Sequence, residues 1–334
     1  MKLHITKAGP QASIQDMGRP DHRSSGVPLS GAADQLSHQL ANFLAGNPAT
    51  AATIEVTWGN WEATVLESGW LCVAGAGAGA LINLEPARIG RLWWLEAGDT
   101  LSLPAKKEGF RCYVATPGGW STPLVLGSRS TCLAAGFGGK EGRLLQAGDH
   151  VEHDPDQDHP LLHLTGRPKW SSPWFVEPTA FWENRVAGNL RYLQGPEWDW
   201  WNEYSQTGWM AAPWTVDSRS NRMGLRLKGD ASFPPDREEN MWSAPVEAGT
   251  VQVPPDGMPI ILMADCQTTG GYPRIAQVAA VDLPKAAQLR PGETVRWEYI
   301  APEQAERLLI KREQELAGLK RALRQQLQYV PGRS

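Results

Sequence analysis

The chain has 334 residues, of which 41 % are hydrophobic and 20 % are charged, fractions that exclude a disordered, collagen-like or acidic-tail protein. Its 36 acidic and 32 basic side chains give a formal net charge of -4, so no overall positive field favours nucleic acid as a partner. At roughly 150 residues per domain, the length predicts about two domains.

Neither a secretory signal nor a membrane span is recognisable. Residues 1–16 lack an apolar core, and no stretch approaches the roughly 20 apolar residues that a span needs. We therefore expect a soluble, cytoplasmic protein with no membrane partner. The cysteines stand far apart without metal spacing, which predicts buried free thiols and no metal: Cys72, Cys112, Cys132 and Cys266.

Short strands separated by turns dominate the predicted elements. Each strand alternates or forms a brief apolar run ending at Gly, Pro or Asp. In chain order they include residues 61–66, 92–95, 100–103, 111–115, 189–193, 259–263 and 295–300. The 34 glycines and 26 prolines also suit turn-rich structure. A mainly β architecture is predicted.

One turn pattern recurs at residues 95–101, 145–151 and 289–295, where a glycine is followed by an acid and then by an alternating strand. Glycine tolerates positive φ, so this pattern predicts a tight turn that begins a strand. Residues 75–79 (GAGAG) lack the spacing of a dinucleotide-binding loop, and we interpret them as a hairpin turn.

Two helices are predicted. Residues 33–45 place Leu36, Leu40 and Phe43 on one face and end at a Gly-Asn-Pro stop. Residues 302–330 repeat apolar residues at helical spacing among charges, which predicts an amphipathic helix. This helix either lies against the protein's own barrel or forms a tail, or it serves self-association or a partner.

A change of composition between residues 150 and 178 predicts a domain boundary, because acids, prolines and tryptophans follow one another there without periodicity. The predicted domains are residues 1–165, 166–300 and a helical tail over 301–334. We interpret His150, His153 and His159, which lie near acids in this segment, as part of a solvated linker.

The first candidate binding motif is residues 9–19 (GPQASIQDMGR) together with residues 25–34 (SGVPLSGAAD). Glycines interleaved with polar side chains can wrap a polar ligand through backbone N–H groups, and Arg19 can hold a carboxylate with two hydrogen bonds. In the alternative, Asp16 pairs with Arg19, Asp34 caps the following helix, and the glycines only form turns.

The second motif, residues 264–274 (ADCQTTGGYPR), directly follows an apolar strand. A buried strand that ends abruptly in polar residues and glycines presents oxygens and an amide at one edge of a sheet. The candidates are Asp265, Gln267, Thr268, Thr269 and Tyr272. The same residue types also build turns whose side chains are satisfied internally, so a purely structural role stays open.

The third motif, residues 217–224 (DSRSNRMG), carries Arg219, Asn221 and Arg222. Guanidinium groups match the geometry of carboxylates and phosphates, so these arginines suit an anionic group, with surface ion pairing as the alternative. The shared Ser-Arg-Ser of residues 128–130 and 218–220 hints at two duplicated barrels.

On these motifs the chain resembles the biotin-dependent carboxyltransferase family that includes allophanate hydrolase subunit 2 and the C subunit of bacterial 5-oxoprolinase. The resemblance extends over about residues 3–300. It is carried by residues 9–19, 26–34, 126–131 (LGSRST), 218–224, 251–260 (VQVPPDGMPI) and 264–278. It implies a mainly β fold of two cyclophilin-like β-barrel subdomains, here with a C-terminal amphipathic helix. Departures from the family are Ala33, residues 83–86 (NLEP) where Asn-Gly is usual, and the helical tail.

The resemblance also implies a function. It points to a subunit of an ATP-dependent 5-oxoprolinase complex, which opens the lactam of a small-molecule substrate, 5-oxoproline, to L-glutamate. The implied catalytic residues are Asp16, Asp265 and Gln267, and the implied substrate-binding residues are Arg19, Asp34, Arg219, Asn221, Arg222, Thr268, Thr269 and Tyr272. In one alternative, the chain acts with carboxybiotin on urea or a related amide; in another, it is a non-catalytic regulator of a sensor kinase pathway.

The missing chemistry is expected on other chains. The sequence has no recognisable ATP-binding loop and no Ala-Met-Lys-Met biotinylation site. The resemblance therefore implies an allophanate hydrolase subunit 1-like partner and a further lactam-handling subunit, with ATP in the complex or, in the carboxybiotin alternative, biotin on a partner chain. Residues 198–201 (WDWW) either form part of a partner surface or pack in the barrel.

Overall fold

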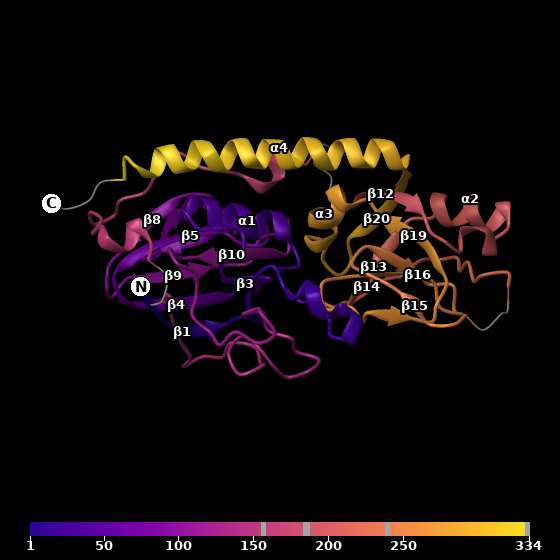
Figure 1. Ribbon diagram of the computed structural model, residues 1–334, viewed down its shortest axis with the longest axis horizontal. Coiled ribbons are helices and arrows are strands. Elements are labelled where there is room, and N and C mark those ends of the chain that lie inside the picture. Colours follow the sequence, from indigo (N-terminus) through magenta and orange to yellow (C-terminus); the bar gives the residue numbers. More distant parts are fainter. Residues whose placement is uncertain (155–157, 183–187, 238–240, 331–334) are drawn as a thin grey trace. The chain divides into compact units, whose positions relative to one another are not determined.

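The computed structural model describes residues 1–154, 158–182, 188–237 and 241–330 (Figure 1). Contacts divide the chain into two compact units. The first unit comprises residues 1–19, 30–181 and 314–334, and the second comprises residues 20–29 and 182–313. The segment 20–29 thus belongs with the second unit, although it precedes most of the first in sequence. The predicted domain boundaries at residues 165 and 300 stay predictions.

The first unit contains two antiparallel sheets. The six-stranded sheet has the order β11 (His150–Glu152), β1 (Lys2–Ala8), β4 (Trp61–Glu67), β9 (Thr100–Leu103), β6 (Ala80–Ile82) and β7 (Glu85–Ala87). The five-stranded sheet has the order β2 (Gln11–Gln15), β3 (Thr53–Thr57), β10 (Arg111–Ala115), β5 (Gly69–Gly75) and β8 (Leu92–Leu95). Alternating apolar side chains from both sheets, among them Leu3, Ile5 and Ile54, form one core.

A short helix covers the five-stranded sheet. α1 (Gln35–Leu44) contacts β5, β10 and β3, and its apolar residues Leu36, Leu40 and Leu44 are buried. Its bounds agree with the helix predicted over residues 33–45. The periodicity of the sequence was informative here because the helix packs one apolar face on a sheet.

The second unit is a closed barrel. Its strand order is β12 (Asn189–Gln194), β19 (Arg274–Val278), β16 (Thr250–Gln252), β17 (Ile260–Leu262), β14 (Gly224–Lys228), β13 (Trp214–Val216) and β20 (Thr294–Tyr299). The parallel pair of β12 and β20 closes it. A two-stranded ribbon of β15 (Ala244–Pro245) and β18 (Thr269–Gly270) is added. The mainly β fold class is confirmed, with full hydrogen-bonded closure in the second unit.

The recurrent glycine-acid turn has the same geometry at all three places. The glycine before each acid has a φ of 96°, 96° and 89°. Each acidic side chain accepts a hydrogen bond from the backbone N–H three residues earlier. The pairs are Glu96 with Asp99, Gln146 with Asp149 and Arg290 with Glu293, at 2.7, 2.8 and 2.9 Å. The turns lead into β9, β11 and β20, as predicted.

The remaining helices are shorter or lie at the C-terminus. They are α2 (Glu203–Ala211), α3 (Leu283–Ala287), α4 (Pro302–Leu327) and the 3-10 turns Pro20–Ser25, Pro160–His163, Pro178–Phe181, Trp198–Trp200 and Ala280–Asp282. The sequence analysis did not predict α2 or α3, because neither shows a sustained apolar face. No helix in the described residues is long and apolar enough to cross a membrane.

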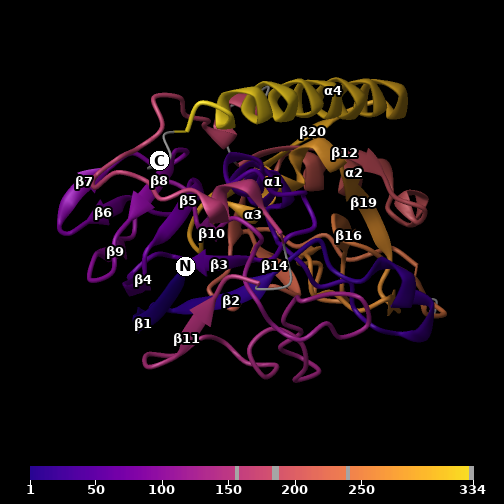
Figure 2. The ribbon, with the colours of Figure 1, turned by 60° about the vertical axis from the view of Figure 1, so that its left-hand side comes forward.

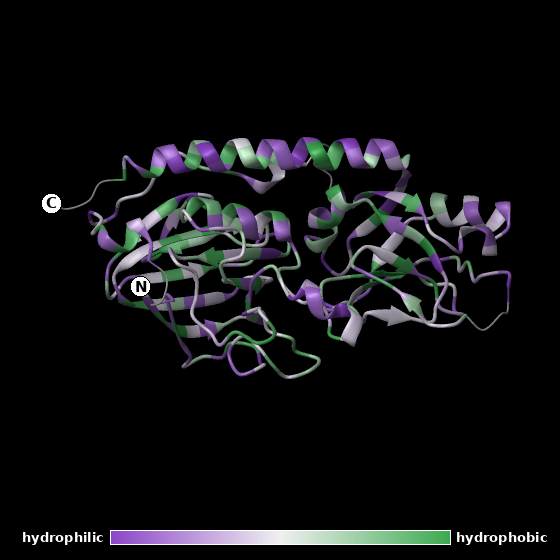
Figure 3. Ribbon diagram, viewed as in Figure 1, coloured by the Kyte–Doolittle hydropathy of each residue, from purple (hydrophilic) through white to green (hydrophobic). Residues whose placement is uncertain are grey.

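The C-terminal helix α4 packs against the protein itself. Hydrophilic and hydrophobic residues alternate along it (Figure 3), and Leu316 and Leu323 are buried. Within the first unit, the ammonium of Lys320 lies 5.1 Å from the centre of the Phe43 ring of α1. Within the second unit, Arg312 donates a hydrogen bond to the Val281 carbonyl. These contacts favour the first of the two predicted roles, a helix laid over its own chain.

Two smaller predictions are resolved by packing. Residues 75–79 are not a hairpin turn, because β5 and β6 belong to different sheets and this segment carries the chain from one to the other. A Cβ on Gly77 would come within 2.3 Å of the Arg111 nitrogen, so the close approach requires glycine.

In residues 198–201, Trp198 and Trp201 are buried and Trp198 contacts the Tyr192 and Trp209 rings, which favours barrel packing.

Candidate functional site

Asp16 follows β2 and is 6 % exposed, and its carboxylate organises a loop more than a hundred residues away. It accepts hydrogen bonds from the Ser128 hydroxyl at 2.6 Å, from the Arg129 backbone N–H at 2.6 Å and from the Gly18 N–H at 2.7 Å. The Ser130 hydroxyl also donates to it. One buried carboxylate therefore brings together two sequence motifs, residues 9–19 and 126–131. We call Asp16 and its hydrogen-bond partners Gly18, Ser128, Arg129 and Ser130 the Asp16 network.

Arg19 lies beside this network and is 1 % exposed. Its guanidinium donates to the Ser130 carbonyl at 2.6 Å and to the Val125 carbonyl at 3.4 Å, and it lies over the Phe137 ring. The sequence left open an ion pair between Arg19 and Asp16. The structure instead shows the Arg19 guanidinium bound to backbone carbonyls. Contact of Arg19 with a substrate carboxylate stays a prediction.

Asp34 is the N-cap of α1. Its carboxylate accepts from the Ser37 N–H at 3.0 Å and from the Ser37 hydroxyl at 2.6 Å. Its own N–H donates to the Tyr113 hydroxyl, which in turn donates to Glu55 at 2.8 Å. With no exposed surface, Asp34 fits the capping alternative, and its contact with substrate stays a prediction.

The Glu55 and Tyr113 pair was not found from the sequence. Both are buried, and Arg111 lies 3.7 Å from Glu55 in the same place. Burial and the neighbouring acids raise the pKa of the Tyr113 hydroxyl well above its usual range, so it stays protonated and donates. This cluster fixes the start of α1 and the segment before it, where Ala33 donates to Glu55.

A cavity of about 340 Å³ in the first unit adjoins the Asp16 network. It is lined by Asp16, Arg129, Asp154 and His159 among others, and Arg129 pairs with Asp154 at 2.5 Å. Burial lowers the pKa of His159, so its imidazole is neutral near pH 7. The solvated-linker interpretation was therefore wrong for His159, which packs at a cavity and accepts from the Leu161 N–H.

In the second unit, Arg222 and Asp265 form a buried bidentate ion pair. The two N···O distances are 2.8 and 2.9 Å, and the side chains are 2 % and 4 % exposed. The Asp265 N–H also donates to the Arg222 carbonyl. Because the two carboxylate oxygens are held by the guanidinium, Asp265 fixes the start of the loop that follows it. Its direct catalytic role stays a prediction.

Arg219 and Asn221 shape the turn before β14. Arg219 is mostly exposed and donates to Asp217 at 2.9 and 3.3 Å. Hydrogen bonds from Arg219 lower the pKa of Asp217 to about 2. The Asn221 side chain accepts from the Met223 N–H at 2.8 Å. Surface ion pairing, the alternative for this motif, describes Arg219, while Arg222 is buried.

Residues 267–272, which we call the Gln267 loop, keep their polar groups at the surface. Gln267 and Thr268 are partly exposed, Thr269 is exposed and Tyr272 is 46 % exposed. The loop is held by backbone pairing, since the Val246 N–H donates to the Thr268 carbonyl and β18 pairs with β15. It is therefore an ordered, accessible polar edge, not a sealed structural turn.

The floor of the Gln267 loop contains Gln252, which the sequence analysis had not singled out. Gln252 is 2 % exposed, accepts a hydrogen bond from the Gln267 amide at 3.4 Å and donates to the Tyr272 carbonyl at 3.1 Å. Its position between two valines, Val251 and Val253, was the available signal. It links both ends of the loop through one side-chain amide.

A second cavity, of about 500 Å³, lies in the second unit. Arg23, Glu247, Arg274 and Gln277 are among its lining residues. Arg274 is engaged by Glu197 at 2.7 and 2.8 Å, whereas Glu247 is exposed and has no hydrogen bond or ion pair from its carboxylate to the described residues. This cavity offers an acceptor for a polar ligand beside the strands that carry the Gln267 loop.

The cysteines are poor candidates for a nucleophile. All four are free and buried, as predicted. Burial raises the pKa of Cys266 to about 11 and that of Cys112 to about 12, so the neutral thiol dominates at physiological pH. Within the described ranges, no group of three or more His, Cys, Asp or Glu side chains is arranged to hold a metal ion.

The predicted site residues thus form two groups. Asp16, Arg19 and Asp34 lie in the first unit, while the second unit holds Arg219, Asn221, Arg222, Asp265, Gln267, Thr268, Thr269 and Tyr272. Most members of the first group are buried in structural hydrogen bonds. Within the second group, the Gln267 loop combines order with exposure.

Comparisons with known proteins place the chain in a family. Residues 25–299 match the family described as carboxyltransferase domain, subdomain A and B. The chain is 37 % identical over 304 residues to the C subunit of 5-oxoprolinase from Escherichia coli K12, covering 91 % of this chain and 93 % of the relative. It is 35 % identical to the C subunit of 5-oxoprolinase from Haemophilus influenzae, covering 93 % and 95 %.

A larger protein contains the same fold. The crystal structure of the K. lactis urea amidolyase superposes with a TM-score of 0.84 at 25 % identity, covering 95 % of this chain but 20 % of that protein. The urea carboxylase of Kluyveromyces lactis gives a TM-score of 0.83 at the same identity. From the near-complete sequence match and the shared fold, the chain belongs to the carboxyltransferase subdomain A and B family, and it is similar to the C subunits of 5-oxoprolinase over nearly their whole length.

Proposed function

We propose that this chain is a subunit of an ATP-dependent 5-oxoprolinase that opens 5-oxoproline to L-glutamate. The observation that carries the proposal is the match, over more than nine-tenths of both chains, to two relatives that are each named as the C subunit of 5-oxoprolinase. That name implies further subunits in those enzymes. We infer that this chain likewise works with partner chains, one of them of the allophanate hydrolase subunit 1 type.

The Gln267 loop supports this proposal chemically. A lactam presents an adjacent N–H and C=O, and the side-chain amide of Gln267 offers an acceptor and a donor that match them. Thr268, Thr269 and Tyr272 add hydroxyl groups on the same accessible edge. We assign Arg222 and Asp265 the role of positioning residues, because their buried ion pair fixes the start of the loop.

ATP supplies the activation that a resonance-stabilised lactam needs before water attacks its carbonyl carbon. We assign the nucleotide to the assembled complex, since the donors described here suit a cyclic amide more directly than a triphosphate. The role of this chain is to bind the lactam and orient it. Arg219 is exposed, and we propose that it exchanges its ion pair with Asp217 for one with the substrate carboxylate.

The test compares the isolated chain with the complex co-purified from the native host. ATP-dependent formation of glutamate from 5-oxoproline is measured with both preparations. We expect turnover by the complex and none by the isolated chain. Full activity of the isolated chain would contradict the subunit assignment, and an inactive complex that retains all partner subunits would contradict the reaction.

A second candidate function is carboxyl transfer from carboxybiotin to urea or a related amide. The structural match to the K. lactis urea amidolyase, which covers 95 % of this chain, favours it. The ureido ring of biotin is also a cyclic amide, so the Gln267 loop fits it for the same reason as a lactam. A biotinylated co-purifying chain, detected with streptavidin, together with urea-dependent ATP hydrolysis would select this function.

A further inference from the structure

A pocket of about 340 Å³ in the first unit lies away from every residue assigned above. It opens between β7 and β8, the terminal strands of the six-stranded and the five-stranded sheet. Figure 2 shows β6, β7 and β8 together at one margin of this unit. Besides these two strands, the segment 168–171 lines the pocket. A hydrogen bond from the Trp94 N–H to the Trp170 carbonyl, at 3.0 Å, holds this segment to β8.

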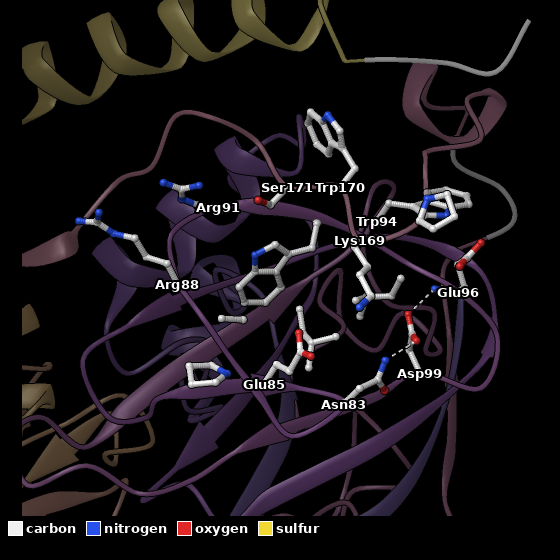
Figure 4. Close-up of a pocket in the computed structure, with 16 residues that line it drawn as sticks. Asn83, Glu85, Arg88, Arg91, Trp94, Glu96, Asp99, Lys169, Trp170 and Ser171 are labelled. Carbon is white, nitrogen blue, oxygen red and sulfur yellow. Dashed lines mark hydrogen bonds between the residues drawn. The ribbon is translucent and has the colours of Figure 1, made fainter.

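Two opposite charges face this pocket without pairing. Glu85, on β7, and Lys169 both line it, and Figure 4 shows their charged ends directed toward its middle. Neither side chain makes a hydrogen bond or ion pair with the described residues, so their charges stand more than 4.0 Å apart. An ammonium and a carboxylate that share a cavity but do not meet leave room for a ligand that bridges them.

Asp99, Arg88 and Arg91, three of the other charged residues of the pocket, are already engaged. Asp99 accepts from the Asn83 amide and from the Glu96 N–H, both at 2.7 Å (Figure 4). Arg88 pairs with Glu177 at 3.1 Å. Arg91 donates to the Ser172 carbonyl at 3.1 Å. The Glu96 carboxylate also lines the pocket and has no partner among the described residues, but Figure 4 shows it at the edge of the pocket, turned away from Lys169. The opposite charges that face the middle are therefore those of Glu85 and Lys169.

The same pocket has an apolar lining and a strained rim. Trp93, which is 3 % exposed, and Ile82 contribute apolar surface. Lys169, a lining residue, has a φ of 58°, in the left-handed region that L-residues other than glycine rarely adopt. The φ of 52° at Asn83 belongs instead to the two-residue hairpin turn between β6 and β7, which requires positive φ. Backbone held in this region concentrates at ligand sites, where the surrounding structure enforces it.

We propose that this pocket binds a free amino acid with an apolar or aromatic side chain. The ligand's ammonium pairs with Glu85, its carboxylate pairs with Lys169, and its side chain packs on the apolar lining beside Trp93. A zwitterion can pair with both charges, whereas a ligand with one charge can pair with only one of them. This proposal does not depend on the proposed 5-oxoprolinase function, since it uses none of the residues assigned to it.

Isothermal titration calorimetry of the full chain tests the proposal. The probes are L-leucine, L-phenylalanine and L-tryptophan, with 2-phenylethylamine and 3-phenylpropionate as analogues of phenylalanine that keep one charge each. We expect saturable binding of at least one amino acid with one site per chain. Both single-charge analogues should bind at least about tenfold more weakly than phenylalanine. Absence of saturation by all three amino acids would overturn the proposal.

Matched variants locate the site. Glu85→Gln and Lys169→Met should each weaken amino-acid binding by at least about tenfold. The controls Glu67→Gln and Lys107→Met remove exposed charges of the same unit outside the pocket and should leave binding unchanged. Circular dichroism verifies the fold of each variant. Equal binding by Glu85→Gln, Lys169→Met and the unaltered chain would refute the assignment of these charges.

Discussion

The Asp16 network and the Gln267 loop have similar compositions but opposite constructions. In the first unit, the Asp16 carboxylate is buried and accepts from the Ser128 hydroxyl and from the Gly18 and Arg129 N–H groups. In the second unit, the buried ion pair of Arg222 and Asp265 lies at the start of the Gln267 loop, and the polar groups of the loop itself stay accessible. One region encloses its carboxylate in hydrogen bonds, and the other leaves polar side chains accessible.

The difference shows that glycine-rich polar motifs of similar composition can have their polar groups either buried in hydrogen bonds or exposed to solvent. A buried carboxylate must be satisfied by hydrogen bonds or ion pairs, since an unpaired buried charge costs several kcal/mol. A solvent-exposed amide or hydroxyl carries no such cost and is free to bind a ligand. Substitutions in the buried networks should therefore act on stability, while substitutions in the Gln267 loop should act on activity.

The largest effect is expected at the buried ion pair of the second unit. Asp265→Ala leaves the Arg222 guanidinium buried without its carboxylate, which should lower the free energy of unfolding by about 3–5 kcal/mol. Urea denaturation followed by tryptophan fluorescence measures it. Since a buried pair replaced by apolar groups is often neutral, the double variant Arg222→Met/Asp265→Leu should recover most of this loss. A single variant as stable as the unaltered chain would contradict the assigned burial.

Asp16→Asn should have the next largest effect. The substitution keeps the size of the side chain but replaces one acceptor oxygen by an NH₂ group, which opposes a donor in the Asp16 network. Loss of charge-assisted hydrogen bonds should lower the free energy of unfolding by about 1.5–3 kcal/mol. Hydrogen exchange should also accelerate at the Arg129 amide, which donates to this carboxylate. Unchanged exchange at Arg129 would show that the network does not hold the loop.

Local features of this fold were predictable from the sequence. The glycine-acid turns, helix α1 and helix α4 are each specified by residues within a few positions of one another, and each occurs within a few residues of the predicted bounds. The pattern of short strands also predicted the mainly β class. Such features depend on φ preferences and apolar periodicity, which a single sequence displays directly.

The partners of the site residues were not predictable in the same way. Asp16 meets Ser128 across 112 positions, and Arg222 meets Asp265 across 43. In the sequence, Gln252 is a polar residue between two valines, and only the barrel places its amide against the Gln267 loop. Sequence alone named most of the polar residues. Which of them are buried in hydrogen bonds and which are accessible depends on the whole fold.

On the accessible side of the comparison, Gln267→Ala should change the free energy of unfolding by less than about 0.5 kcal/mol. In the assembled complex it should lower glutamate formation about tenfold, because a hydrogen bond to the lactam is lost. Gln194→Ala, an exposed glutamine of β12 in the same unit, is the matched control and should leave activity unchanged. Equal activity of Gln267→Ala and Gln194→Ala would remove the loop from the site.

The smallest effect is expected from a single cysteine substitution at the boundary between the buried strand and the accessible loop, which falls between Cys266 and Gln267. Burial raises the pKa of Cys266 to about 11, so on the order of one molecule in a thousand carries a thiolate at pH 8. An ordinary thiol is about one-quarter ionised there. Iodoacetamide should therefore modify the thiol introduced by Gln267→Cys far faster than Cys266, as mass spectrometry of the digested native chain would show. The modification rate of Cys266 should rise as the pH rises toward its pKa. Equal rates at the two neighbouring positions would contradict an accessible loop that begins where the buried strand ends.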